Sequence, residues 1–179
     1  MVHDSELVHR IDAFPTEPFD GRAFRATRQS LDPLVSSTSG GRWMPNGAAG
    51  VFYTSFERDG ALAEISFHWS QLSPRPTRPI MLHTLGVVAR RTLKLVRADL
   101  SALGVPEDTY GTMNLKRTQE IGAAVEFLGC DGLIAPSARW PCDNLMLFPN
   151  NIGGRSSVEL LSSETVDWSR WASDQGLLK

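Results

Sequence analysis

Short β-prone runs and amphipathic helical stretches follow one another irregularly along this chain, and this irregularity restricts the fold more than any other pattern. Regular strand–helix–strand repeats, which build doubly wound parallel sheets, are missing, and neither a GxGxxG nor a P-loop motif occurs. The pattern therefore predicts an α+β fold in which helices flank a mixed sheet. We expect strands at residues 23–27, 51–55, 80–88, 92–97, 132–136, 144–148 and 157–161, and helices at 59–72, 115–128 and 164–175.

Turn-forming residues separate these elements. Residues 29–50 are rich in Ser, Gly, Pro and Asn and predict a long loop, which in a compact domain is usually functional or mobile. Pro15 and Pro18 predict a loose segment over residues 1–20, with a short helix or turn. Asp59 is suited to be the N-cap of the helix that follows it.

The length, charge and cysteine content limit the class of protein. A chain of 179 residues fits a single domain, 1–179, with a core at about 20–162. The net charge of -2 argues against a general nucleic-acid-binding scaffold. No run approaches the roughly 20 apolar residues of a membrane span, and two isolated cysteines fit a reducing compartment. We therefore expect a cytoplasmic protein that contacts neither membranes nor nucleic acid directly.

Positive charge is concentrated in one part of the chain. Residues 21–50 contain four arginines and a single acid, which suits a small anionic ligand. Arg42 follows Gly40 and Gly41, so a guanidinium lies beside backbone that can approach a ligand closely. Backbone N–H groups next to such a cation could form a phosphate-binding nest. Arg25 lies in an apolar strand, where it needs either a salt-bridge partner or an open cleft.

Two further side chains follow Arg42 at equal steps along the chain. Tyr53 is either a core strand residue or a ring that stacks on a base. Glu64 is either a surface residue paired weakly with His68 or a carboxylate at the rim of a cleft, able to stabilise a developing cation. No further clustered ligands accompany Glu64 and His68, so we expect no metal. Ser137, at a strand end, suits a turn or an orienting hydrogen bond, since no GxSxG motif surrounds it.

Several segments resemble the RES domain family, which is named for an arginine, a glutamate and a serine. They are FRAT (24–27), GGRW (40–43), VFYTS (51–55), ALAEISFHW (61–69) and APSAR…NLMLF (135–148). The resemblance places the namesake residues at Arg25 or Arg42, at Glu64 and at Ser137. One departure is Met44, which stands where the family usually has asparagine.

The resemblance implies a fold similar to that of ADP-ribosyltransferases such as diphtheria toxin. It also implies a metal-independent bacterial toxin of a type II toxin–antitoxin pair, which breaks the nicotinamide–ribose bond of NAD⁺ and is inhibited by an Xre-like antitoxin. The ADP-ribose acceptor would be a protein, phosphate or water. The resemblance assigns the transition-state carboxylate to Glu64, stacking to Tyr53 and an orienting bond to Ser137. It assigns the NAD⁺ phosphates to Arg25 and Arg42, with Arg28 as a further binding candidate.

Two alternatives of other classes remain open at this point. A nucleotide-binding regulatory module without turnover would use the same arginines and Tyr53, while Glu64 would matter little. A structural partner-binding protein would use exposed Trp168 and Trp171 as its interface.

Overall fold

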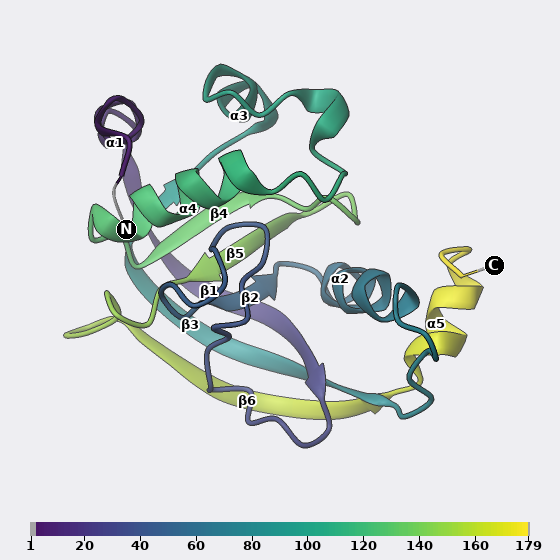
Figure 1. The fold of residues 1–179 in the computed structure, drawn as a ribbon. Coiled ribbons are helices and arrows are strands. Elements are labelled where there is room, and N and C mark those ends of the chain that lie inside the picture. The colour runs from purple at the N-terminus through teal and green to yellow at the C-terminus, as the bar shows by residue number, and fades with distance from the viewer. Residues whose placement is uncertain (1–2, 179) are drawn as a thin grey trace.

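The computed structural model describes residues 3–178 and shows a strongly curved six-stranded sheet with helices packed against it (Figure 1). Its strands are β1 (Thr16–Arg28), β2 (Phe52–Ser55), β3 (Ile80–Lys94), β4 (Gly132–Pro136), β5 (Asp143–Leu147) and β6 (Ser157–Val166). Its helices are α1 (Ser5–Asp12), α2 (Arg58–Ser70), α3 (Arg97–Ala102), the short 3-10 helix η1 (Glu107–Thr109), α4 (Lys116–Phe127) and α5 (Trp168–Asp174). The predicted α+β class is confirmed.

The strand order gives the sheet its curvature. The order is β1-β2-β5-β4-β3-β6, and β1 also pairs along most of its length with β3. Because β1 and β3 pair directly, the first five strands of this order close into a ring, and β6 extends from β3. All pairs are antiparallel except β3 with β4. A mixed sheet of this kind explains why no strand–helix–strand repeat is visible in the sequence.

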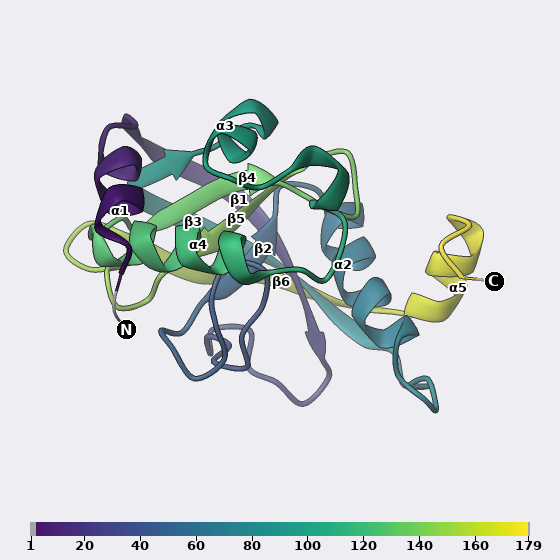
Figure 2. The same ribbon diagram turned by 45° about the horizontal axis from the view of Figure 1, so that its top comes forward.

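Two groups of helices cover different parts of the sheet. In Figures 1 and 2, α1, α3 and α4 gather near β4, whereas α2 and α5 lie toward the other end of the molecule. The first group shares a core with Trp43 and Met44 of the long loop, and the second shares a core with Ile80 and Leu82 of β3. The loop of residues 29–50 extends beyond β2 in Figure 2. None of the helices within residues 3–178 is both long and apolar enough to cross a bilayer.

The prediction of two separate strands, at 80–88 and 92–97, is wrong. They form one strand, β3, that ends at Lys94, and α3 begins at Arg97. Arg90 and Arg91, which lie between the two predicted segments, have exposed side chains, and the backbone stays extended through them. Their N–H groups donate to the Asp131 carboxylate at 2.6 and 3.3 Å, so the strand continues without losing hydrogen bonds.

The prediction of a loose segment over residues 1–20 is confirmed for its short helix and wrong from Thr16 onward, while residues 1 and 2 lie outside the described part of the chain. α1 is capped by Asp4, whose carboxylate accepts from the N–H groups of Glu6 and Leu7. β1 then begins at Thr16 and runs through Pro18. The β1–β3 register shifts between Glu17 and Phe19, so Pro18 lies at an irregularity where its missing N–H is tolerated.

Helix ends show both confirmed and incorrect predictions. Helix α4 lies within the predicted 115–128, and Gly129 after it has φ 75°, as a helix-terminating glycine requires. Asp59 is not an N-cap, because α2 starts one residue earlier with Glu57 at that position. The Asp59 carboxylate instead accepts a hydrogen bond from Trp171 Nε1 at 3.1 Å. The last helix starts at Trp168 rather than 164, since β6 continues to Val166.

The tryptophans proposed as an exposed interface are largely covered. Trp168 is only 1% exposed and meets Trp69 edge to face, with ring centroids 5.4 Å apart. Trp171 is half-buried beside Trp140. Both rings thus attach α5 to the rest of the molecule, and an interface built on exposed Trp168 is excluded.

Candidate functional site

A cavity of about 280 Å³ opens between α2, the loop of residues 29–50 and the strands β1, β2 and β5. Three of the predicted site residues, Arg42, Tyr53 and Glu64, lie in its wall. The wall is partly apolar and partly charged, as a pocket for an amphipathic organic ligand requires. Its other members include Phe24, Ala26, Ser37, Gly41, Trp43, Ile65, His68, Met113, Arg139, Asn144 and Met146.

The carboxylate of Glu64 is held by two neutral donors. Ser137 Oγ donates to Glu64 Oε1 at 2.7 Å, and Asn144 Nδ2 donates to the same oxygen at 2.9 Å. Within the described residues, no cation pairs with Glu64, and its Oε2 accepts no hydrogen bond. The side chain is therefore fixed through one oxygen, while its negative charge is not neutralised by a salt bridge.

Ser137 reaches Glu64 because it directly follows β4 in the tight connection to β5. Its own N–H donates to Cys142 O at 2.8 Å, which closes the turn. Its hydroxyl accepts from the N–H groups of Arg139 and Trp140, at 3.1 and 3.2 Å. With both amides donating to this oxygen, the hydroxyl proton is directed to Glu64. The predicted orienting bond of Ser137 thus exists, and its partner is Glu64.

Arg42 projects from the long loop into the cavity wall. Its Nη2 donates to Thr112 O at 3.2 Å, and its guanidinium lies 4.9 Å from the centroid of the Tyr110 ring. Desolvation lowers the pKa of Arg42, and the nearby Tyr110 and Glu64 oppose that shift. An arginine remains charged in spite of such a decrease, so the cavity has a fixed cation.

The glycines before Arg42 serve a different purpose from the predicted anion nest. The N–H of Gly41 donates to Met44 O at 2.9 Å, so it is already used within the loop. A Cβ on Gly41 would lie 2.6 Å from the Tyr53 hydroxyl, which is closer than real Cβ contacts. Gly40 has φ 76°, a conformation that other residues rarely adopt. The two glycines let the loop fold tightly over Tyr53 and thereby place Arg42. Met44, at the position where the family usually has asparagine, is 2% exposed and packs in the core.

Tyr53 contributes a largely buried phenol. Burial raises the pKa of Tyr53 to about 12, against the smaller opposite effect of the Trp43 and Met44 N–H groups. The ring is therefore neutral at ordinary pH. Its hydroxyl is buried and has no hydrogen-bond partner among the described residues. The hydroxyl lies under the backbone of Gly41, beside the N–H groups of Trp43 and Met44.

Arg25 and Arg28 do not join the cavity. Phe24 and Ala26 line it, and because side chains alternate along a strand, Arg25 faces the other side of β1. There Arg25 donates to Val35 O at 2.8 Å and lies 5.0 Å from the Phe52 ring centroid. Desolvation lowers the pKa of Arg25 to about 10, partly opposed by Asp32. Arg25 thus ties the loop to the sheet.

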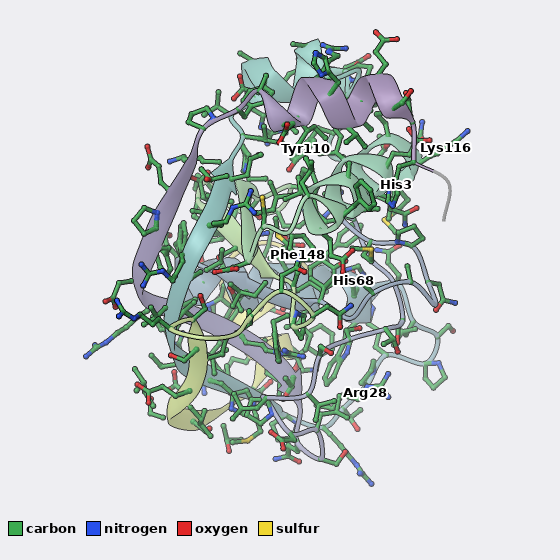
Figure 3. All side chains as sticks on the ribbon, turned by 90° about the vertical axis from the view of Figure 1, so that its left-hand side faces the viewer. His3, Arg28, His68, Tyr110, Lys116 and Phe148 are labelled. Atoms are coloured by element: carbon green, nitrogen blue, oxygen red, sulfur yellow. The ribbon has the colours of Figure 1, made fainter. Side chains whose placement is uncertain are left out.

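Arg28 is the last residue of β1 and is exposed. Figure 3 shows it well separated from His68 of the cavity wall. Of the two candidate positions for the family's arginine, only Arg42 therefore shares the cavity with Glu64.

Among the wall residues that were not identified from the sequence, Asn144, Arg139 and His68 are the ones that act on Glu64 or on its charge. Asn144 binds Glu64 from β5, directly across the β4–β5 pair from Ala135. Arg139 lies in the β4–β5 turn, with its guanidinium 3.3 Å from the Phe67 ring centroid. Asn144 and Arg139 fall inside the APSAR…NLMLF segments, which was the available signal.

The third of these residues, His68, lies one helical turn after Glu64 on α2. Desolvation at the cavity rim lowers the pKa of His68. The charges of Arg139 and Arg42 act in the same direction, and Glu64 acts against them. His68 is therefore neutral at pH 7 and adds no charge to the cavity wall.

Comparison with known proteins agrees with this architecture. One solved structure, the crystal structure of the M. tuberculosis MbcT–MbcA toxin–antitoxin complex, contains a chain with TM-score 0.82 and 22% sequence identity. The match covers 95% of the present chain and 97% of that chain. No curated protein matches by sequence. The RES domain matches residues 8–169, which is most of the chain and includes every residue of the cavity wall. The protein therefore belongs to the RES domain family.

Proposed function

We propose that this protein is the toxin of a toxin–antitoxin pair and that it consumes NAD⁺ by breaking the nicotinamide–ribose bond. The observation that carries the proposal is the Glu64 carboxylate, oriented by Ser137 and Asn144 in the wall of a cavity that also holds Arg42. Membership of the RES domain family and the toxin–antitoxin structure with the same fold support the biological role.

The reaction requires stabilisation of a cation rather than a general acid. The bond between the nicotinamide nitrogen and the ribose C1″ breaks, its electron pair stays on the nitrogen, and nicotinamide leaves as a neutral molecule. Positive charge then develops on the ribose, as in the transition states of glycoside hydrolysis. A carboxylate that is not paired with a cation is the group that stabilises this charge best, and Glu64 is such a group.

The other wall residues would bind and orient the dinucleotide. Arg42 would hold the phosphates, since a guanidinium pairs with phosphate through two parallel hydrogen bonds. The Tyr53 ring, which lines the cavity, would pack against the nicotinamide side. Ser137 and Asn144 would keep Glu64 in its reactive orientation without reducing its charge.

The acceptor completes the reaction. A water molecule, a phosphate or a protein side chain attacks C1″, forms the new bond and loses a proton when it is a neutral nucleophile. The products are respectively free ADP-ribose, ADP-ribose 1″-phosphate and an ADP-ribosylated protein. Mass spectrometry of the products formed in phosphate buffer and in cell lysate identifies which acceptor is used.

The partner in this proposal is an antitoxin that covers the cavity. The chain with the same fold was solved in a toxin–antitoxin complex, and the resemblance stated above implies an Xre-like partner. A small Xre-like gene beside this one supports the pairing. Co-expression of its product should suppress both the toxicity and the loss of cellular NAD⁺.

Replacing Glu64 tests whether its negative charge is needed for the reaction. Purified protein should release nicotinamide from NAD⁺, and Glu64→Gln should reduce turnover about 100-fold or more, because the amide keeps the acceptor oxygen but loses the charge. Glu17→Gln, which changes an exposed carboxylate far along β1, should leave turnover unchanged. Release is measured by chromatography.

The opposite results separate the proposal from its alternative. No nicotinamide release, with or without phosphate or cell extract, would exclude the enzyme and favour a nucleotide-binding module without turnover. Full activity of Glu64→Gln would remove Glu64 from the mechanism but leave NAD⁺ consumption in place.

A further inference from the structure

We propose that Arg139 and Arg42 together form a two-cation site for the diphosphate of the bound dinucleotide, with Arg139 as its second phosphate-binding residue. The inference rests on the proposed function for the identity of the whole substrate. Independently of the whole substrate, the cavity binds a nucleoside diphosphate, and the β4–β5 turn supplies one of the two cations of the diphosphate site.

The cavity wall has more positive than negative charge. The wall contains two guanidinium groups, of Arg42 and Arg139, against the single carboxylate of Glu64, while His68 is neutral. No ion pair within the described residues involves either of these arginines. Two partly desolvated guanidinium groups that share a single carboxylate are costly. A ligand with a negative charge on each of two phosphates would place one anionic group beside each guanidinium.

Arg139 is held in place by contacts that do not neutralise its positive charge. The guanidinium stacks on the Phe67 ring, and the residue's N–H donates to Ser137 Oγ at 3.1 Å. Within residues 3–178, no side-chain N–H of Arg139 donates a hydrogen bond. A guanidinium that stacks on an aromatic face retains its fork of donors for a phosphate.

Arg139 and Glu64 are both held in place by Ser137. Both are bound to the same Ser137 hydroxyl, one as donor to it and the other as acceptor from it. Phe67, on which Arg139 rests, follows Glu64 by one turn of α2. The cation is therefore held in register with the carboxylate, as required when one substrate has a diphosphate and a reacting ribose close together.

Arg42 supplies the opposite side of this site. It comes from the long loop, whereas Arg139 comes from the β4–β5 turn, and the charge of Arg42 contributes to lowering the pKa of Arg139. A diphosphate bound between them would connect two segments that lie far apart in the sequence. The site would thus distinguish a nucleoside diphosphate from a nucleoside by two charged contacts rather than one.

Calorimetric titration with ADP and with adenosine tests the inference without requiring turnover. Arg139→Gln should weaken ADP binding about 10- to 100-fold, the effect of one charge-assisted contact, and leave adenosine binding unchanged. Arg139→Lys should recover part of the loss, because it keeps the charge but not the fork. Arg155→Gln is the matched control, since Arg155 is exposed in the loop before β6.

Several results would overturn the inference. They are no ADP binding by the unmodified protein, wild-type ADP affinity in Arg139→Gln, or equal weakening of ADP and adenosine, which would mean that Arg139 only supports Phe67. If Arg139→Gln does not fold, Arg139→Lys decides, because unchanged ADP affinity in that variant contradicts a fork contact. Arg139-dependent ADP binding without nicotinamide release would refute the proposed function alone. Nicotinamide release with Arg139-independent ADP binding would refute this inference alone.

Discussion

The hydroxyl of Ser137 is a single group on which several parts of the candidate site depend. It donates to Glu64, accepts from two backbone N–H groups of its own turn, and is only 4% exposed. A buried hydroxyl with all its bonds satisfied holds its partners in one arrangement. The orientation of the carboxylate and the shape of the β4–β5 turn are therefore coupled through one oxygen atom.

Ser137→Ala should reduce nicotinamide release about 10-fold through kcat, with a smaller change in KM for NAD⁺. The reason is that one of two hydrogen bonds to Glu64 Oε1 is lost, a bond worth about 1 to 1.5 kcal/mol, while Asn144 keeps the other. Steady-state kinetics measure both constants. Ser162→Ala, on the exposed part of β6, is the control and should behave as wild type. An unchanged kcat in Ser137→Ala would show that Asn144 alone orients Glu64.

At the scale of elements, the site depends on how closely α4 approaches the long loop. A Cβ on Gly122 of α4 would lie 1.8 Å from the backbone O of Trp43, and Gln119 Nε2 donates to Gly41 O at 2.9 Å. Trp43 and Gly41 flank Arg42, so α4 holds the backbone on both sides of the cavity cation. The loop is thus positioned by backbone contacts with a helix that is distant in sequence.

Gly122→Ala should destabilise the protein by about 1 to 3 kcal/mol, the usual cost of overpacking. Replacing glycine by alanine inside a helix ordinarily stabilises by about 0.5 to 1 kcal/mol, so the sign of the effect is the test. Urea denaturation measures the free energy of unfolding. Gly153→Ala, where nothing lies within 4 Å of the added Cβ, is the control and should show little change. A stabilised Gly122→Ala would mean that the loop can move away from α4 at no cost.

For the whole molecule, the direct pairing of β1 with β3 decides the shape, because it closes the ring of strands. His83 lies at this junction and is 3% exposed. Its Nε2 is 2.9 Å from Thr27 Oγ1 of β1, and its Nδ1 is 2.7 Å from Ser163 Oγ of β6. One imidazole on β3 therefore bridges the strands on both sides.

The stability of the fold should decrease as the pH falls, because this imidazole is neutral in the folded protein. Burial, and then the charge of Arg25, lower the pKa of His83 below its ordinary value of 6.5, while Asp32 acts against them. The folded protein binds the proton less well than the unfolded chain does. The stabilising contribution of the neutral imidazole is therefore fully present above pH 6.5 and is lost progressively below it, until the pH reaches the lowered pKa. The contribution of His83 to this slope is at most about 1.4 kcal/mol per pH unit.

Unfolding free energies at pH 7 and pH 5.5 test this expectation. His83→Gln should show a smaller loss between the two values than the unmodified protein, even if it is less stable at both. His9→Gln, an exposed residue of α1, should retain the full loss. An identical loss in His83→Gln and in the unmodified protein would assign the pH dependence to other groups.

The sequence by itself determined the α+β class, the helices α2 and α4 and the strands β4 and β5, and it grouped Arg42, Tyr53 and Glu64, which line one cavity. These depend on local patterns: apolar periodicity, a glycine stop, and a motif whose residues lie near one another in the chain. The cavity contacts of Asn144 and Arg139 were not predictable in this way. Each arises when the β4–β5 turn meets α2, which lies far away in the sequence.

Only the tertiary structure decided which of Arg25 and Arg42 shares the cavity with Glu64. Arg25 and Arg42 both have the chemistry that phosphate requires, but the alternation of side chains along β1 turns Arg25 away from the cavity that Phe24 and Ala26 line. Which face of a strand is inward depends on what packs against it, and here that is α2 on one side and the loop carbonyl of Val35 on the other. A sequence pattern specifies two faces; packing chooses between them.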